Sequence, residues 1–483
     1  MREPDEGQDG ERKASPRRAP CLTSLGLRLS LTGVLAVGAG ASAQDAAPPV
    51  PEAAAGEACT SSEECASRLG YGNVCDDGRC RPYVSRTDVL GLLGLKDRSG
   101  PPPKPFQILP SLFPAIGYNP ALGFLGGVYG GVGMYLGALA DTTISNANVT
   151  ALVTTERQVI VSLTSNVMTA GNQWELIGDW RYLLYNQPTY GLGTGPEASS
   201  SGEPLPGGKT AVAVTGSQPM DFDQFRFHEL VLKRVAANMY VGGGYGLDHY
   251  AKIVDKDLDL ASSPQRVTAA YAYAAHYGFD PSQYTVSGVT AAALYDSRDS
   301  TINPYRGYYG TLQLTVNPEF LGSSRSSTVV HAEFRTYVPM SVEVPRNVLA
   351  FWVYLDGVVD GALPYLALPA TGWGPRQRNG RGYPQGRFRG PWEAYAEAEW
   401  RFQITNDGLF GGVLFANAES FSSPGFTSAG YVSPGVKVLE YLQPAAGLGL
   451  RILINRDSRT NLDLDVAFGQ GFFGFWLNAG EYF

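Results

Sequence analysis

After Phe106 the sequence alternates between apolar and polar residues with a period of two. In the segment from Asn461 to Phe468, leucine, valine and phenylalanine occupy one face, whereas Asp463 and Asp465 occupy the other. The segment from Trp392 to Phe402 sets alanine and tryptophan against glutamate and arginine in the same way. A period of two places successive side chains on opposite faces of a β-strand. Residues 106–483 are therefore predicted to be all-β.

Fifteen strands of this kind can be recognised, whereas the antiparallel barrels of bacterial outer membranes have an even number of strands. We therefore expect sixteen strands, with the remaining one before Gly123 or within the polar stretch 186–221. Between residues 251 and 283 the sequence instead favours a short helix inside a long loop. The predicted strands span residues 121–137, 145–155, 158–168, 173–185, 222–234, 238–250, 284–297, 307–317, 327–338, 347–357, 389–403, 409–419, 445–454, 460–469 and 472–483.

The alternation fits a barrel that crosses a membrane. A membrane strand needs only about 9–11 residues, and the sequence beyond residue 43 holds no run of about 18 apolar residues for a membrane helix. Many aromatic residues stand near the predicted strand ends, where membrane barrels place their interfacial girdles. A soluble secreted β-sandwich is the alternative, because one face of each sandwich strand also meets a core. We predict a transmembrane antiparallel β-barrel.

The composition excludes two broad classes. Of the 483 residues, 44% are hydrophobic and 17% are charged, and the formal net charge is −8. The apolar fraction is too high for an intrinsically disordered chain, and the acidic balance does not suit a general nucleic-acid binder. The 59 glycines exceed the average usage of about 7%, which fits many strands packed closely together.

Residues 1–43 have the layout of a secretory signal peptide. Basic residues precede an apolar stretch from Leu25 to Val37, and Ala41-Ser42-Ala43 supplies a small-residue cleavage site. An ordinary N-terminal helix would not explain that ending. Cys21 precedes the apolar stretch, so it is a poor lipoprotein anchor. We expect the mature chain to be exported.

Four cysteines follow the expected cleavage site within a short segment. In an exported protein, a dense and even set predicts two disulfides that staple a module too small to bury a real core. A zinc site is the alternative, but the spacings lack the paired C-x₂-C turns of zinc ribbons. Proline, alanine and glycine predict linkers at 44–55 and 84–105 around a cysteine-rich knuckle at 56–83. The cysteines are Cys59, Cys65, Cys75 and Cys80.

Two motifs and the last residue carry a family resemblance. The first motif joins the end of one predicted strand to the start of the next. The second, Gly380-Arg-Gly-Tyr383, precedes a strand that contains Glu399-Trp-Arg-Phe402. The chain stops on Phe483, and such an ending is similar to the recognition signal that outer-membrane barrels present to their assembly machinery. The residues of the first motif are Asp296, Arg298, Asp299, Pro304 and Gly307.

In this order and context, the motifs resemble the bacterial surface antigen superfamily of BamA/TamA-like outer-membrane barrel proteins, over roughly residues 106–483. The resemblance implies a sixteen-stranded barrel whose long sixth extracellular loop folds back into the lumen and carries Arg381, Gly382 and Tyr383. In relatives the motif arginine contacts acidic residues on the inner wall of the next two strands. The matching residues here are Glu399, Asn417 and Glu419.

Two departures from the family pattern are visible. Asn417 and Glu419 stand where the family's F-x-D-x-G pattern has aspartate and glycine. Charge pairing would then fall mainly to Glu399, with Glu397 or Glu419 as further candidates. Relatives also carry periplasmic repeat domains before the barrel, and residues 44–105 leave no room for one. The resemblance therefore indicates a short member of the superfamily that lacks those repeats.

Catalytic chemistry is not indicated. The four histidines form no metalloprotease motif, the sequence shows no G-x-S-x-G or phosphate-binding loop, and we expect no cofactor and no metal. The glycine-rich run from Gly126 to Gly133 is not followed by a helix pattern, so it fits a bending strand better than a dinucleotide turn. Asp296 and Asp299 could be read as metal ligands. With Arg298 between them, we interpret them as part of a strand-end ion-pair network.

The resemblance implies a non-enzymatic outer-membrane barrel that assists insertion or translocation of polypeptides, through a weak seam for which the strand 121–137 is a candidate. Expected partners are outer-membrane lipid, client outer-membrane or secreted polypeptides, and an accessory periplasmic protein or lipoprotein, but no nucleic acid. The cysteine module would lie in the periplasm. A pore-forming or structural barrel without insertase activity is the first alternative, favoured by Asn417 and the missing repeats. The secreted sandwich is the second.

Overall fold

The computed structural model describes most of the barrel region and the cysteine module. The described residues are 30–33, 56–94, 104–119, 123–139, 141–375, 378–456, 458–479 and 481–483. The predicted signal peptide lies outside the described residues except for 30–33, and the predicted linker 44–55 lies wholly outside them. Among the described residues, no helix is both long enough and apolar enough to cross a membrane.

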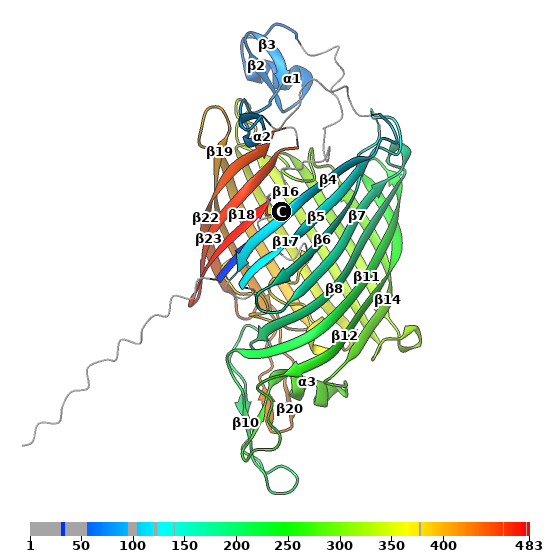
Figure 1. Ribbon diagram of the computed structural model, residues 1–483, viewed down its shortest axis with the longest axis vertical. Helices are drawn as coiled ribbons and strands as arrows, with labels where there is room; N and C mark the ends of the chain where they lie inside the picture. The colour runs from blue at the N-terminus through cyan, green and yellow to red at the C-terminus, as the bar shows by residue number, and fades with distance from the viewer. Residues whose placement is uncertain are drawn as a thin grey trace, which may run out of the picture.

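One large sheet dominates the structure, and Figure 1 shows its strands wrapped into a cylinder. It has seventeen strands, of which all but β1 (Ser30–Gly33) follow one another in antiparallel order. The predicted sixteen-stranded antiparallel barrel is therefore confirmed. Its strands are β4 (Leu109–Asn119), β5 (Gly123–Met134), β6 (Ser145–Thr154), β7 (Val159–Met168), β8 (Trp174–Thr189), β11 (Gln218–Ala236), β12 (Met239–Asp255), β14 (Tyr284–Asp296), β15 (Gly307–Asn317), β16 (Ser327–Pro339), β17 (Val348–Gly361), β18 (Trp392–Gln403), β19 (Phe410–Phe421), β22 (Gln443–Asn455), β23 (Thr460–Gly469) and β24 (Phe472–Ala479).

The strand that the alternation did not reveal is β4, which lies before Gly123 as one of the two expected places. It contains Pro110 and Pro114, and proline interrupts the strand pattern because it cannot donate to a ladder. The last predicted strand, 472–483, is too long, because β24 ends at Ala479. The predicted short helix is α3 (Ala269–Tyr277), closed by Gly278 in the left-handed region.

The two faces of the wall differ as the alternation predicts. Along β23, Asp463 and Asp465 are buried in the lumen, whereas alternate residues point outward and Phe468 is 55% exposed. Along β18, Glu397 and Glu399 are buried in the lumen, whereas Trp400 lies outside. The cylinder thus has an apolar exterior and a charged interior.

Four long loops, at residues 190–217, 256–283, 362–391 and 422–442, gather at one end of the cylinder, the lower end in Figure 1. They pack around a shared aromatic core that includes Tyr273, Tyr365 and Phe426. The opposite end has shorter connections. The short elements in loops and turns are β9 (Ser199–Ser200), β10 (Ala211–Ala213), β13 (Gln265–Val267), β20 (Phe426–Ser428), β21 (Tyr431–Ser433), η1 (Ala170–Asn172), η2 (Glu319–Leu321) and η3 (Tyr365–Ala367).

The cysteine module sits on the end of the barrel opposite the long loops (Figure 1). It comprises α1 (Ser62–Leu69) and a hairpin of β2 (Asn73–Asp76) and β3 (Arg79–Pro82), and α2 (Val89–Leu92) follows it. The hydroxyl of Tyr71 donates to the Ser341 carbonyl at 2.8 Å, in the turn between β16 and β17. The backbone N–H of Arg86 donates to the Asp407 carbonyl at 2.8 Å, between β18 and β19. The module and the segment after it are therefore fastened to two barrel turns.

The first and last barrel strands meet at a seam. There β1 runs parallel to β24, pairing Ser30–Gly33 with Gly474–Leu477, and Gly33 also pairs with Tyr118 of β4. In contrast, β4 and β5 pair without interruption in antiparallel register, from the pair Leu109 and Gly133 to the pair Asn119 and Gly123. The seam is thus bridged by a short segment that belongs to the predicted signal peptide.

Candidate functional site in the barrel lumen

The loop between β17 and β18, residues 362–391, turns back into the barrel and presents Arg381 between two glycines. Gly380 and Gly382 have φ angles of +77° and +108°, a region that side-chain-bearing residues rarely adopt. A Cβ on Gly382 would lie 2.5 Å from the Cβ of Ala445 on β22. The glycines therefore let the loop tip approach the inner wall closely enough for the arginine to reach three strands.

Arg381 is completely buried and is held by carboxylates from two separated parts of the wall. Its Nη2 donates to Glu397 and Glu399 of β18, and its Nη1 donates to Oδ2 of Asp465 on β23 at 2.7 Å. The guanidinium also lies 3.6 Å from the ring centroid of Phe415 on β19. A planar guanidinium can satisfy several carboxylates at once, which fixes both the position and the orientation of the loop tip.

Two further buried arginines extend these contacts into a network, which we call the arginine cluster. Arg401 pairs with Glu399 at 2.6 Å. Arg451 pairs with Asp465 at 2.5 Å and with Glu481 at 2.9 Å. The cluster combines three arginines with five carboxylates, and each cation is shared. Its members are Arg381, Glu397, Glu399, Arg401, Arg451, Asp463, Asp465 and Glu481.

The other residues of the loop motif make their own anchors. The Tyr383 hydroxyl donates to the Pro444 carbonyl at 2.8 Å and accepts from the Gln470 N–H at 3.1 Å. Asn417 donates to the carbonyl of Arg381 at 3.0 Å. The amide thus binds the loop backbone, a role that an aspartate could not fill because an ionised carboxylate only accepts hydrogen bonds.

The wall residues that were expected to bind the motif arginine contact different parts of the 362–391 loop. Glu399 contacts the Arg381 guanidinium, whereas the Thr371 hydroxyl donates to the Glu419 carboxylate, lying 3.1 Å from each of its two oxygens. Glu419 is therefore a partner of the loop but not of the motif arginine. Asp465, a direct ligand of Arg381, was not among the predicted partners. The alternation around it had already assigned it to the polar face of its strand, and that signal could have found it.

The last residues of the chain also enter the lumen, where the end labelled C in Figure 1 lies. Phe483 is 1% exposed and its ring centroid lies 5.3 Å from that of Trp352. The Tyr482 ring stacks on the Arg381 guanidinium at 3.8 Å. Arg401 donates to the Phe483 carbonyl at 3.0 Å. Phe483 therefore does not lie on the terminal strand, contrary to the prediction. It lies inside the barrel, next to the arginine cluster.

The strand-end motif lies in the turn between β14 and β15, at the end of the barrel with the shorter connections. Arg298 pairs with Asp296 at 2.6 Å, and Arg459 pairs with Asp299 at 2.8 Å. Gly307 has a φ of +106°, and a Cβ there would lie 2.4 Å from the Ser297 carbonyl oxygen. The two aspartates therefore bind different arginines, and this motif does not meet the loop motif.

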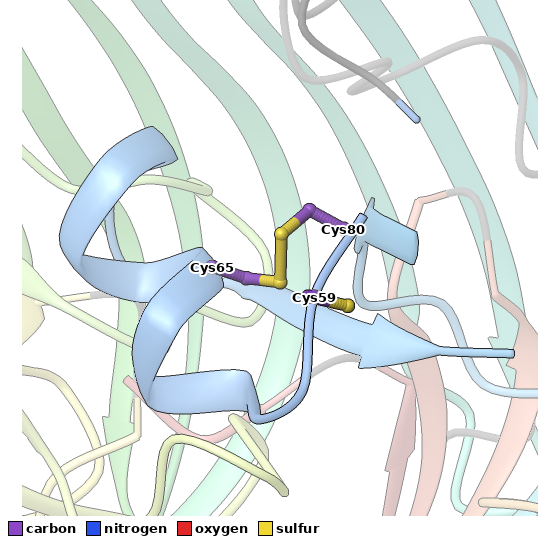
Figure 2. A group of neighbouring side chains, drawn as sticks. All are labelled: Cys59, Cys65 and Cys80. Atoms are coloured by element: carbon purple, nitrogen blue, oxygen red, sulfur yellow. A yellow bond between two sulfur atoms is a disulfide. The ribbon is translucent and has the colours of Figure 1, made fainter. Parts of the chain in front are cut away.

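The four cysteines form two disulfides, as predicted, and the structure pairs Cys59 with Cys75 and Cys65 with Cys80. Figure 2 shows Cys59 beside the Cys65–Cys80 bond, and the sulfurs of these three residues lie within 4.8 Å of one another. Because every one of these sulfurs is already bonded to another sulfur, none is a thiolate that could bind zinc.

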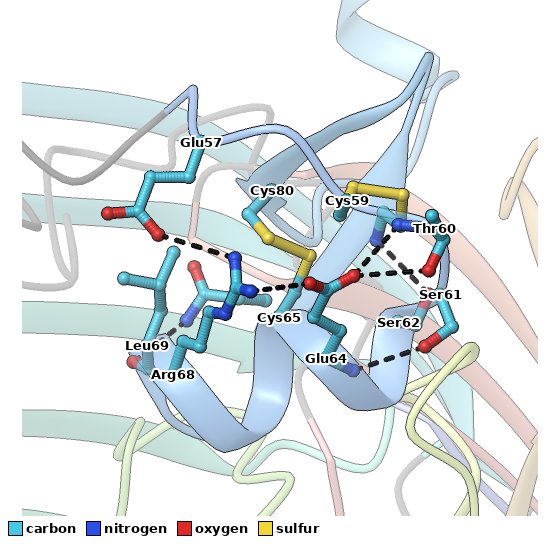
Figure 3. Close-up of a disulfide and its surroundings, with 12 residues drawn as sticks. Glu57, Cys59, Thr60, Ser61, Ser62, Glu64, Cys65, Arg68, Leu69 and Cys80 are labelled. Atoms are coloured by element: carbon cyan, nitrogen blue, oxygen red, sulfur yellow. Dashed lines mark hydrogen bonds and ion pairs between the residues drawn. A yellow bond between two sulfur atoms is a disulfide. The ribbon is translucent and has the colours of Figure 1, made fainter.

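Figure 3 shows how the first turn of α1 is capped beside the disulfides. The Ser61 hydroxyl accepts from the Glu64 N–H at 3.2 Å, and the Glu64 carboxylate accepts from the Thr60 N–H at 2.9 Å. This reciprocal arrangement is a capping box. The Thr60 N–H lowers the pKa of the Glu64 carboxyl, and Arg68 at 2.6 Å and the Thr60 hydroxyl lower it further.

A sixteen-stranded antiparallel cylinder with an apolar exterior, a charged interior and a long loop folded through its lumen defines an outer-membrane β-barrel. Residues 265–468, which include the loop motif and the strands that bind it, match the family model of the Omp85 superfamily domain. The resemblance to the superfamily of BamA/TamA-like barrels that the motifs indicated is therefore confirmed for this part of the chain.

Comparisons with whole proteins show more distant likenesses. A search of curated proteins found no match. BamA from Haemophilus ducreyi lacking POTRA domains 1–3 aligns at 15% identity over 75% of this chain and 67% of that chain, with a TM-score of 0.48. CdiB from Acinetobacter baumannii aligns at 13% identity over 72% of this chain and 53% of that chain, with a TM-score of 0.42. The siderophore receptor PirA from Acinetobacter baumannii aligns at 11% identity over 77% of this chain and 58% of that chain, with a TM-score of 0.32.

Proposed function

We propose that this barrel assists the insertion or translocation of polypeptides at the bacterial outer membrane. The observation that carries the proposal is the seam, where the short segment β1 adds in parallel to the edge of β24 and contacts β4 through one residue. An exposed strand edge is a template for another chain. A client strand would bind the same edge once β1 has left with the signal peptide.

The arginine cluster supports this proposal because it stabilises the part of the wall that lies on the other side of β24 from the seam. It fastens the 362–391 loop to β18 and β23, so that part of the barrel is rigid. The chain after β24 binds the same cluster through Glu481, which lies 2.9 Å from Arg451. Opening would therefore be confined to the joint between β24 and β4, while the rest of the wall keeps its shape.

Locking the seam tests the proposal. Gly33 pairs with both Leu477 of β24 and Tyr118 of β4, so these two positions would face each other if β24 and β4 close directly on one another in the absence of β1. The double variant Leu477→Cys/Tyr118→Cys should form a disulfide across the seam. Proteoliposomes that contain the mature barrel should accelerate the folding of a urea-denatured eight-stranded outer-membrane barrel. The oxidised variant should lose that acceleration and regain it after reduction.

The alternative function, a passive pore or structural barrel, predicts the opposite result. Asn417 favours it, because this residue binds the loop backbone where relatives carry an aspartate. A passive barrel would not accelerate client folding above the level of empty liposomes, whether the seam is locked or free. Equal folding rates with the wild type, the locked variant and empty liposomes would therefore reject the insertion proposal.

We further propose that the cysteine module faces the periplasm. It lies at the end with the shorter connections, and outer-membrane barrels have short periplasmic turns and longer extracellular loops. A peptide tag inserted between Gly207 and Gly208, in a long loop, should bind antibody on intact cells. A tag inserted between Asp77 and Gly78 of the module should bind antibody only after the outer membrane is permeabilised; labelling of both tags on intact cells would exclude this orientation.

A further inference from the structure

A small cavity lies among the long loops, at the end of the barrel away from the cysteine module. It has a volume of about 90 Å³, and its lining residues come mainly from the loops 190–217, 362–391 and 422–442. A water molecule needs about 10–15 Å³ of such space, so the cavity has room for several waters or for one small ion. It is too small for a whole sugar or a nucleotide.

Arg387 lines this cavity, and its side chain has no acceptor. The guanidinium lies over the Tyr190 ring at 5.0 Å and over the Phe388 ring at 4.7 Å, and both of these residues also line the cavity. Among the described residues, the guanidinium forms no ion pair and donates no hydrogen bond. Aromatic rings that stack on a guanidinium leave the N–H groups at its edge free. The edge of this guanidinium is therefore open to a ligand.

Two carboxylates of the surrounding loops and wall could balance the charge of Arg387, and neither pairs with it. Glu197 lines the same cavity, but it is exposed at the rim. Glu419 is bound by the Thr371 hydroxyl, which lies 3.1 Å from each of its oxygens. A charge that is partly removed from water without a partner is costly, so the cavity favours an anion beside Arg387.

The backbone adds unpaired donors to the same cavity. In the part of the chain that the structure describes, the N–H groups of the lining residues Leu192, Gly195 and Gly216 have no acceptor. A Cβ on Gly195 would lie 2.6 Å from Cγ2 of Val436, so a side chain at this position would displace its neighbour. Free backbone N–H groups in a concave, glycine-rich turn are a common means of binding anions.

We propose that this cavity binds a phosphate group. A tetrahedral anion has acceptor oxygens on every side and suits donors from several loops, whereas a planar carboxylate needs only the arginine fork. Free phosphate and the phosphate of a lipid headgroup present the same oxygens to Arg387, so both are sources of this ligand. The proposal does not rest on the insertion function, because no described lining residue belongs to the seam strands β4 and β24.

Equilibrium dialysis of the purified full chain in detergent micelles against radiolabelled inorganic phosphate tests the proposal. The wild type should bind one phosphate per chain, and Arg387→Gln should weaken binding by about tenfold through the loss of charge-assisted hydrogen bonds. Glu197→Gln should strengthen binding, because it removes a negative charge from the rim. A wild type that binds no phosphate, or an Arg387→Gln variant that binds as tightly as the wild type, overturns the proposal.

Arg325→Gln is the matched control for the loss of a positive charge at this end of the barrel. Arg325 lies over the Phe279 ring at 5.9 Å and beside Gly278 in the loop 256–283, but it does not line the cavity. This variant should bind phosphate as the wild type does. An equal loss of binding in Arg325→Gln and Arg387→Gln would assign the binding to the general charge of the loops and would overturn the proposal.

A second probe separates the two sources of phosphate. Dihexanoyl phosphatidic acid carries a phosphomonoester on short lipid tails, and it should displace the labelled phosphate if the cavity accepts a headgroup. If the cavity accepts free phosphate alone, this lipid should not compete, whereas unlabelled phosphate should. Either result supports the site, and label that unlabelled phosphate does not displace overturns it.

A measurement on the wild type keeps the test valid even where Arg387→Gln does not fold. Phenylglyoxal modifies arginines that water can reach, and mass spectrometry reports the rate at each position. Inorganic phosphate should slow the modification of Arg387 and leave that of Arg325 unchanged. The same rate at Arg387 with and without phosphate overturns the proposal.

Discussion

At the scale of single residues, Arg381 shows what a buried charge requires. Removing a guanidinium from water costs several kcal/mol, and only close carboxylates with good geometry offset that cost. Glu397, Glu399 and Asp465 surround it, and Phe415 and Tyr482 cover its two faces. Loss of Arg381 would therefore leave Glu397 without its cation, and would leave Glu399 and Asp465 with Arg401 and Arg451 alone.

Arg381→Ala should therefore lower the free energy of unfolding by about 3–5 kcal/mol, the cost of breaking a buried ion pair. The midpoint of urea unfolding in lipid vesicles, followed by the gel mobility shift of the folded barrel, measures this loss. Arg387→Ala is the control, because Arg387 packs over the Tyr190 and Phe388 rings and binds no carboxylate of the arginine cluster. Similar small effects of both substitutions would show that the cluster does not stabilise the barrel.

Gly382→Ala should also destabilise the barrel, by more than Gly471→Ala. Both glycines have positive φ angles, +108° and +68°, so both substitutions strain the backbone. Only Gly382 faces a wall atom, the Ala445 Cβ at 2.5 Å, whereas a Cβ on Gly471 meets nothing within 4 Å. The same unfolding measurement compares the two. A larger loss at Gly471 would contradict the close approach of the loop to β22.

Some residues of the lumen site could be predicted from the sequence, and others could not. The family motif identified Arg381, and the alternation identified Glu399 as a lumen residue. Neither connected Asp465 or Glu481 to Arg381, because these residues are distant in sequence and meet only when β23 and the chain end close around the loop. Glu419 was expected beside the motif arginine and instead binds Thr371.

At the scale of elements, the cysteine module depends on disulfides and capping rather than on a core. Its α1 helix is short, and a helix of that length is marginal without other support. The Cys65–Cys80 bond ties α1 to the hairpin, and the Glu64 carboxylate caps its first turn (Figure 3). The Thr60 N–H and Arg68 both favour the ionised form of this carboxyl, so the cap is sensitive to acid.

The lowered pKa of Glu64 predicts how the module responds to pH. Folding favours the ionised carboxylate, so its stabilising effect is present above the ordinary pKa of 4.5 and is lost as the pH falls below that value. Reduction of Cys59–Cys75 in the full chain by a phosphine, followed by mass spectrometry, should be faster at about pH 3.5 than at about pH 6. Glu64→Gln should flatten this difference. An unchanged pH dependence in the variant would assign it to another group.

At the scale of the whole molecule, the different chemistry of the outward and inward faces of the sixteen strands determines that the barrel lies in a membrane. Alternate residues of each strand meet lipid, and the others meet the 362–391 loop and the end of the chain. The long loops form an aromatic core of their own at one end, and the cysteine module covers part of the other. The apolar band between the two ends is the surface that requires a membrane.

A fluorophore on Leu464→Cys should be quenched by brominated lipid tails, because this residue points outward from β23. The same label on Val212→Cys, in β10 among the long loops, should not be quenched, although Val212 is also apolar and 45% exposed. Both measurements use the folded barrel in vesicles. Quenching at Val212 together with water accessibility at Leu464 would contradict the position of the membrane.

The sequence by itself determined the number and alternation of the barrel strands, the helix between residues 251 and 283, the pairing chemistry of the cysteines and the loop motif. These features are local, because a period of two, a cap or a cysteine spacing is readable within a few residues. Only the tertiary structure decided which carboxylates hold Arg381 and how the last residues enter the lumen. Those outcomes depend on strand register around a closed wall, which joins residues far apart along the chain.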